Sequence, residues 1–274
     1  MANENWQDSG GGNRLNDGTK TLYVYTAGAG QPVVLVHGWG MHSGVWEDVA
    51  EALLDVCRVT VIDLPGHGYS RGLGSGHSLP TLAETVAAAV PFPAVWIGWS
   101  LGGLLAQQVA LTMPERVSRL VLVNSTACFT QRPDWPHAVA LLVLRRFAEE
   151  LRQNHRAVLK RFIALEVHGS DNAGEQYRQL KALLFQHGES DPAALGDGLA
   201  ILERADLRAD LPQIQCPTLL LMGQRDQLTP VAAGEAMRKL LPNARLHVFP
   251  GAGHAPFFSH LPDFIAELRV FLDA

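Results

Sequence analysis

The fold is decided by the stretch Ala94-Val95-Trp96-Ile97-Gly98-Trp99-Ser100-Leu101-Gly102-Gly103. Its first four residues form a short apolar run typical of a buried strand, and residues 104–113 have the pattern of a helix. The Gly-x-Ser-x-Gly between them is typical of a sharp strand-to-helix turn, in which a Cβ at either glycine would collide with neighbouring backbone. A serine in so short a pattern can also simply cap a helix. Strand, turn and helix in this order instead favour Ser100 as an exposed nucleophile at a helix N-terminus, where the helix dipole favours developing negative charge.

Apolar runs like residues 94–98 recur along the chain and alternate with amphipathic stretches. This alternation predicts an α/β fold with a mostly parallel central sheet flanked by helices. The other predicted strands are residues 32–37, 58–63, 119–123, 217–222 and 245–249, and residues 262–272 form the closing helix.

The strand pattern stops in the middle of the chain, where segments such as 138–151 and 157–167 have helical periodicity. We therefore expect one domain over residues 1–274 with a helical lid inserted at about 130–205. On a helix, one apolar face of this insertion would carry Leu144, Leu151, Val158, Phe162 and Leu165. A break near Asn154 would interrupt that stripe.

Two later residues supply the acid and the base of a serine hydrolase. In hydrolases built on such a sheet, the chain order is nucleophile, acid, base, with the last two on loops that follow late strands. Asp226 follows the predicted strand 217–222, and His254 follows 245–249. Since Thr229 before Pro230 fits a helix cap, we expect Asp226 to be free to accept a hydrogen bond from His254.

The oxyanion hole needs two backbone N–H groups. One comes from Leu101, directly after the nucleophile, and we assign the second to Trp39 in His37-Gly38-Trp39-Gly40, where His37 supports the loop. The predicted chemistry is acylation of Ser100 and release by water, which requires no cofactor. Dehalogenases and epoxide hydrolases would carry aspartate at position 100, so Ser100 disfavours both.

Composition limits the partners and the compartment. The 274 residues include 22 basic and 27 acidic ones, a net charge of -5 that offers no general attraction for nucleic acid or an anionic membrane. We find no signal peptide in residues 1–16 and no apolar run long enough to span a membrane. Three cysteines at unrelated spacings suggest reduced, mostly buried thiols and no metal. We expect a soluble, cytoplasmic monomer.

Several sequence motifs, spread along the whole chain, resemble those of α/β hydrolases in general. These motifs are His37-Gly38-Trp39-Gly40, Asp63-Leu64-Pro65-Gly66-His67-Gly68, Gly98-Trp99-Ser100-Leu101-Gly102 and Gly253-His254-Ala255-Pro256-Phe257. A narrower set resembles the pimeloyl-[acyl-carrier protein] methyl ester esterases of biotin synthesis: Trp39, Trp99, Cys128-Phe129 with Trp135-Pro136, Arg161-Phe162-Ile163-Ala164-Leu165, and Gly198-Leu199-Ala200-Ile201-Leu202 with Asp206-Leu207-Arg208.

This narrower resemblance implies a serine carboxylesterase that removes methanol from the pimeloyl methyl ester on an acyl-carrier protein. It implies substrate contacts at Trp39, Ser100, Leu101, Phe162, Ile163, Ala164, Leu165, Glu166 and His254. Glu166 stands where the family is expected to have glutamine. Carrier docking is implied at Arg161 and Arg178, which match by position, and Arg156 beside Ala157 substitutes for a third arginine.

Two alternatives remain open from the sequence. One is another lidded serine hydrolase, such as a lactonase, a carbon–carbon bond hydrolase or a thioesterase, that acts on free small molecules. The other is a non-catalytic ligand receptor, which an intact nucleophile, acid, base and oxyanion hole disfavour.

Overall fold

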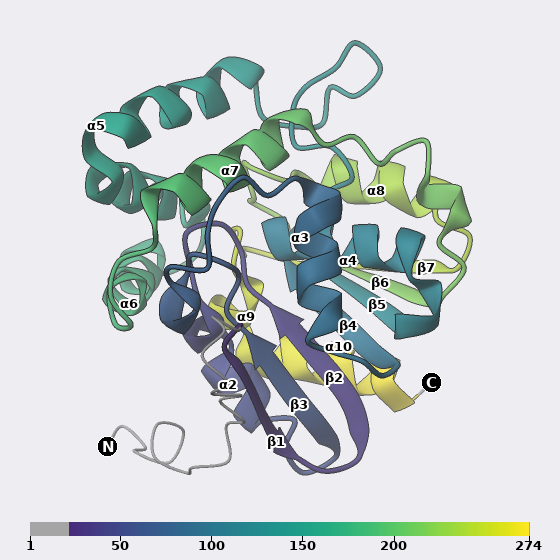
Figure 1. Ribbon diagram of the computed structural model, residues 1–274. Helices are drawn as coiled ribbons and strands as arrows, with labels where there is room; N and C mark the ends of the chain where they lie inside the picture. The colour runs from purple at the N-terminus through teal and green to yellow at the C-terminus, as the bar shows by residue number, and fades with distance from the viewer. Residues whose placement is uncertain (1–21, 274) are drawn as a thin grey trace.

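The computed structural model describes residues 22–273, so the predicted features of residues 1–16 lie outside the described residues. Within this range one sheet has seven strands in the order β1-β3-β2-β4-β5-β6-β7 (Figure 1). Only β1 runs antiparallel to its neighbour, and all other described pairs are parallel. The strands are β1 (Val24–Gly28), β2 (Gln31–Val36), β3 (Cys57–Ile62), β4 (Ala94–Trp99), β5 (Val117–Val123), β6 (Thr218–Gly223) and β7 (Ala244–Phe249).

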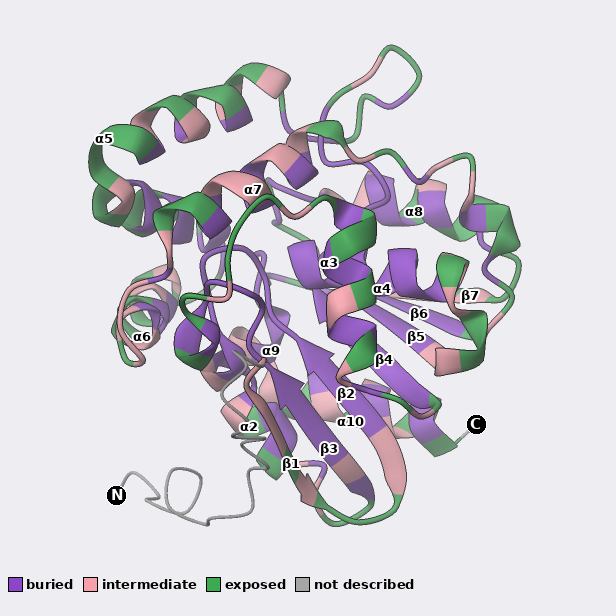
Figure 2. Ribbon diagram, viewed as in Figure 1, coloured by how far each residue is buried: buried purple, intermediate pink, exposed green. Residues whose placement is uncertain are grey.

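The central strands are apolar on both sides because helices cover both faces of the sheet. In Figure 1, α3 (Leu79–Ala88) and α4 (Leu101–Thr112) lie on the near face, and α2 (Glu47–Glu51) and α10 (Leu261–Asp273) lie behind. All residues of β4 are buried, and Figure 2 shows the strands as the buried centre of the molecule. The remaining sheet helices are α8 (Val231–Leu240) and α9 (Pro256–Ser259). The predicted α/β class is confirmed.

Three helices interrupt the sheet between β5 and β6. They are α5 (Leu141–Glu166), α6 (Ala173–Leu184) and α7 (Pro192–Arg204), and they lie together past one end of the strands (Figure 1). The predicted break in α5 is confirmed, because Asn154 has the non-helical angles φ -154° and ψ 82°. Its Oδ1 accepts the N–H of Ala157 at 3.0 Å, so the side chain caps the second half of the helix.

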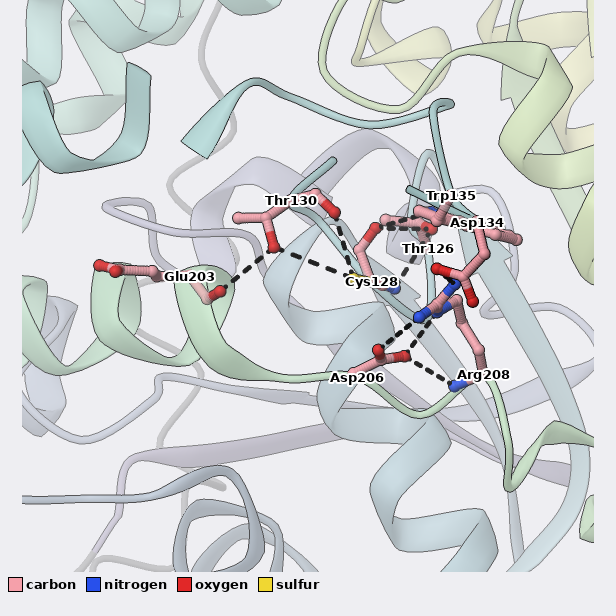
Figure 3. Close-up of polar contacts among 8 residues, drawn as sticks. All are labelled: Thr126, Cys128, Thr130, Asp134, Trp135, Glu203, Asp206 and Arg208. Atoms are coloured by element: carbon pink, nitrogen blue, oxygen red, sulfur yellow. Dashed lines mark hydrogen bonds and ion pairs between the residues drawn. The ribbon is translucent and has the colours of Figure 1, made fainter. Parts of the chain in front are cut away.

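The chain segments that enter and leave this insertion are joined by side chains (Figure 3). Thr130 Oγ1 donates to the carbonyl of Glu203 at 3.2 Å. Arg208 binds Asp206 at 2.7 Å and Asp134 at 3.0 Å. The guanidinium lowers the pKa of Asp206 through this hydrogen bond. The insertion is therefore anchored at both ends to one polar cluster.

The three cysteines are free, with Cys57 and Cys128 buried and Cys216 intermediate. No group of side chains suited to hold a metal ion occurs among residues 22–273. None of the helices described in that range is both long and apolar enough to cross a membrane.

Candidate active site

Ser100 lies at the turn between β4 and α4, in a strained backbone conformation. Its φ is 54° and its ψ is -117°, a left-handed φ that non-glycine residues rarely adopt. The turn is this tight because backbone atoms pass close by on both sides. A Cβ on Gly98 would lie 2.3 Å from the carbonyl oxygen of Gly102, and one on Gly102 would lie 2.3 Å from that of Val36. Both glycines of the motif are therefore sterically required.

The carboxylate of Asp226 holds the ring of His254. Nδ1 of His254 donates to Oδ2 of Asp226 at 2.7 Å, with both side chains buried. The N–H of Leu228 donates to Oδ1 at 2.8 Å, and the hydroxyl of Thr229 donates to Oδ2. The expectation that Thr229 caps the next helix is wrong: Pro230 precedes α8 without a side-chain cap, because the Thr229 hydroxyl is bound to Asp226.

The environment of His254 suits a general base. Burial by itself lowers the pKa of His254, but the charge and hydrogen bond of Asp226, together with Glu166, outweigh it and the net pKa is raised. Nε2 is buried and has no hydrogen-bond partner among the described residues. The indole N–H of Trp99 donates to the carbonyl of His254 at 2.8 Å, which fastens this loop beside the turn that carries Ser100.

Two backbone N–H groups beside Ser100 are available as oxyanion donors. Leu101 begins α4, so its N–H has no acceptor within the helix, and neither this group nor the N–H of Trp39 donates to another described group. The loop that carries Trp39 passes against the serine, since a Cβ on Gly38 would lie 3.2 Å from Cβ of Ser100. His37 supports this loop: Nδ1 bonds the carbonyl of Gly38 at 2.8 Å and Nε2 accepts from Leu64 at 2.9 Å.

The indole of Trp39 connects this loop to the inserted helices. Its N–H donates to the carbonyl of Leu195 at 2.8 Å, and its ring meets Phe162 edge-on with centroids 4.7 Å apart. Gly198 leaves room for the indole, since a Cβ there would lie 2.5 Å from Trp39. Helices α5 and α7 therefore pack directly over the loop of the candidate oxyanion hole.

The segment Phe162 to Glu166 presents two different faces. Phe162, Ile163 and Glu166 are buried, whereas Ala164 is exposed and Leu165 half-buried. Ala164 and Leu165 line an outer hollow of about 450 Å³ together with Val143, Arg146, Phe147, Arg161 and His168. The structure thus brings only part of the expected contact segment to the inner side of the helix.

Glu166 stands out among the predicted substrate contacts. Its side chain is 2% exposed, and neither carboxyl oxygen has a hydrogen-bond partner among the described residues. Its backbone carbonyl accepts the N–H of His254 at 3.0 Å. Burial raises the pKa of Glu166 to about 8, a shift that His254 opposes and Asp226 reinforces.

The three arginines expected to dock the carrier each have an acidic partner within the insertion. Arg156 pairs with Glu189, Arg161 with Glu150 and Arg178 with Glu175. All three arginine side chains are more than half exposed. Exposed ion pairs of this kind contribute about 0 to 1 kcal/mol, so an acidic partner could exchange with them at little cost.

One positioning residue was missed in the sequence. Asn124 follows β5 with a left-handed φ of 39°. Its Nδ2 donates to the carbonyl of Gly253 at 2.7 Å, and its Oδ1 accepts the N–H of Gly223 at 2.7 Å. It thereby joins the loop of His254 to the strand that leads to Asp226. An asparagine at the carboxyl end of a central strand was the only available signal.

The chain matches known proteins along most of its length. The model of the alpha/beta hydrolase fold family matches residues 31–261. The chain is 42% identical over 253 residues to a pimeloyl-[acyl-carrier protein] methyl ester esterase of Xylella fastidiosa, covering 92% of this chain and 98% of the relative. It is 41% identical over 255 residues to the protein of that name from Aliivibrio fischeri, covering 93% and 98%.

Solved structures show the same architecture. An esterase from Exiguobacterium antarcticum superposes with a TM-score of 0.85 at 26% identity, covering 92% of this chain and 96% of that chain. An enol-lactonase from Burkholderia xenovorans has a TM-score of 0.83 at 21% identity, covering 92% and 96%, a likeness that shows the fold alone.

Proposed function

The chain belongs to the pimeloyl-[acyl-carrier protein] methyl ester esterases of the alpha/beta hydrolase fold, and on that premise we propose that it hydrolyses the methyl ester of pimeloyl-[acyl-carrier protein] in biotin synthesis. The products are pimeloyl-[acyl-carrier protein] and methanol. The observation that carries the proposal is the buried His254–Asp226 pair, 2.7 Å apart, fastened beside a strained serine. Relatives of this name match the chain nearly end to end.

The proposed mechanism uses the groups of this site in a fixed order. Nε2 of His254 takes the proton of Ser100 as Oγ attacks the ester carbonyl, and the N–H groups of Leu101 and Trp39 stabilise the oxyanion. His254 then gives its proton to the departing methanol. Water, deprotonated by His254, attacks the acyl-enzyme, and His254 returns the proton to Oγ of Ser100 as the free carboxyl group is released. Each oxyanion donor contributes about 3 kcal/mol to lowering the barrier.

We propose that the insertion at about 130–205 is a lid over the acyl pocket of a single domain. Support comes from the contacts of Trp39 with Phe162 and Leu195, which place apolar lid side chains over the oxyanion loop. Phe162 and Ile163 face inward and suit an aliphatic acyl chain. Ala164 and Leu165 line the outer hollow, so they can contact the substrate only if its acyl chain reaches that hollow.

We propose that the carrier protein docks through exposed arginines of the lid. Acyl-carrier proteins are expected to be acidic, and this chain is itself negative by -5, so attraction requires a local basic surface. Arg156, Arg161 and Arg178 offer exposed basic side chains there. The same charge balance argues against binding to nucleic acid or to an anionic membrane. The proposal includes a cytoplasmic monomer, and the proposed chemistry requires no cofactor.

The decisive experiment supplies pimeloyl methyl ester on its carrier and measures methanol release and the mass of the carrier-bound acyl group. We expect methanol release with the carrier thioester intact, and none with Ser100→Ala. A free short-chain methyl ester and an acyl-carrier thioester serve as comparison substrates. Cleavage of the thioester, or a higher kcat/KM for the free ester than for the carrier-bound ester, would favour a hydrolase of another substrate class.

A further inference from the structure

Glu166 lies at the C-terminal end of α5, held against the loop of the candidate base. Its carbonyl oxygen accepts the N–H of His254 at 3.0 Å. Its carboxyl group is buried, and no described residue donates a hydrogen bond to Oε1 or Oε2. A buried carboxylate without a donor or a cation is much less stable than the neutral acid in the same place.

A second carboxyl group beside the same imidazole shows the contrast. Asp226 accepts hydrogen bonds from His254, Leu228 and Thr229, so donors surround its negative charge. Burial is the largest effect on Glu166 and raises its pKa to about 8. The charge of His254 opposes this shift, and the charge of Asp226 adds to it. One carboxyl group of the site is thus surrounded by hydrogen-bond donors, whereas the other has none among the described residues.

This inference rests on the proposed ester hydrolysis and concerns the control of that same site. We propose that Glu166 binds the ester substrate as a neutral acid, donating its carboxyl proton in a hydrogen bond to an ester oxygen, and that its ionised form suppresses turnover. An ester group carries only hydrogen-bond acceptors. A protonated carboxyl group can satisfy one of them, whereas a carboxylate presents lone pairs to lone pairs.

The pH dependence follows from this difference between the two forms. Loss of the Glu166 proton removes the hydrogen-bond donor and places a negative charge beside the ester oxygen. Activity therefore falls as the pH rises through the pKa of Glu166.

The test compares pH profiles of kcat/KM, which report groups of the free enzyme. The substrate is a small free methyl ester, so that carrier docking plays no part. The variants are Glu166→Gln, which keeps a hydrogen-bond donor but cannot ionise, and Glu149→Gln, the same change at an exposed position of α5. With a pKa of about 8, the wild type should lose about thirtyfold between about pH 7 and about pH 9.5.

In Glu166→Gln, kcat/KM should fall by less than about twofold over the same pH range. Glu149→Gln should behave as the wild type. The decline at acid pH, set by His254, should remain in all three proteins. A thirtyfold alkaline loss that persists in Glu166→Gln would overturn the inference, as would its disappearance in Glu149→Gln.

An infrared difference spectrum of the wild type gives a second readout that does not depend on the folding of a variant. The stretch of a protonated carboxyl group should be present at about pH 7 and lost at about pH 9.5. Absence of that band would also overturn the inference. A wild-type protein without any esterase activity would refute the proposed function instead, and the band would still decide whether Glu166 is a neutral acid.

Discussion

Replacement of Asp226 by asparagine tests how the imidazole of the site is oriented. The carboxylate accepts Nδ1–H of His254 at 2.7 Å, the N–H of Leu228 at 2.8 Å and the hydroxyl of Thr229. Asparagine can keep one oxygen on Leu228, but it then turns its NH2 group toward the histidine. Nδ1 must now accept a hydrogen bond, so the proton moves to Nε2, the atom that has to receive the proton of Ser100.

The expected loss is large because the substitution removes both the correct tautomer and the charge that stabilises the imidazolium. A change of this kind lowers kcat by about four orders of magnitude, which corresponds to about 5.5 kcal/mol in the barrier. The residual activity should show a second signature. Without the charge of Asp226, burial dominates the pKa of His254, so the acid limb of kcat/KM moves to lower pH.

The assay is the steady-state hydrolysis of a small ester, with circular dichroism to verify folding. The control is Asp263→Asn, the same change at an exposed position in the first turn of α10, which should retain the wild-type kcat. Activity of Asp226→Asn within about tenfold of the wild type would refute the reasoning. Some other carboxylate would then have to orient His254.

Three further variants test the carrier surface, the turn and the lid anchor. Arg161→Glu with Arg178→Glu should raise KM for the carrier-bound ester more than for a small free ester, most strongly at low salt; equal losses would argue against docking there. Gly102→Ala should lower the free energy of unfolding in urea by about 3 kcal/mol or more, because its Cβ would lie 2.3 Å from the Val36 oxygen; an unchanged midpoint would contradict this. Arg208→Ala removes the ion pairs with Asp134 and Asp206, so it should lower the free energy of unfolding by about 1 kcal/mol and speed proteolysis of the lid. An unchanged rate of digestion would show that the lid needs no such anchor.

The sheet could be predicted where strands are buried on both faces. Residues 94–98 read as a continuous apolar run and form β4 (Ala94–Trp99), because helices cover both sides of it. The edge strand β1 (Val24–Gly28) was missed. It is half-buried or exposed along its length, so its sequence shows neither a continuous apolar run nor a clear alternation.

For the site, chain order alone led to Asp226 and His254, and the structure places these two side chains together. Their supports could not be found in that way. Asn124 bonds the N–H of a residue 99 positions away, a contact that no local pattern encodes. Helical periodicity grouped residues 162–166 correctly in a helix, but it could not show that Glu166 turns inward while Ala164 turns outward.

The central claim is that Ser100 is the nucleophile of an ester hydrolase. It is tested most directly by incubating the protein with a fluorophosphonate and locating the adduct by peptide mass spectrometry, alongside Ser100→Ala. We predict an adduct on Ser100 in the wild type and none in the variant, because Ser100 lies in a strained turn and the loop that carries His254 is fastened beside that turn. An adduct on another serine, or labelling that persists in Ser100→Ala, would contradict the account.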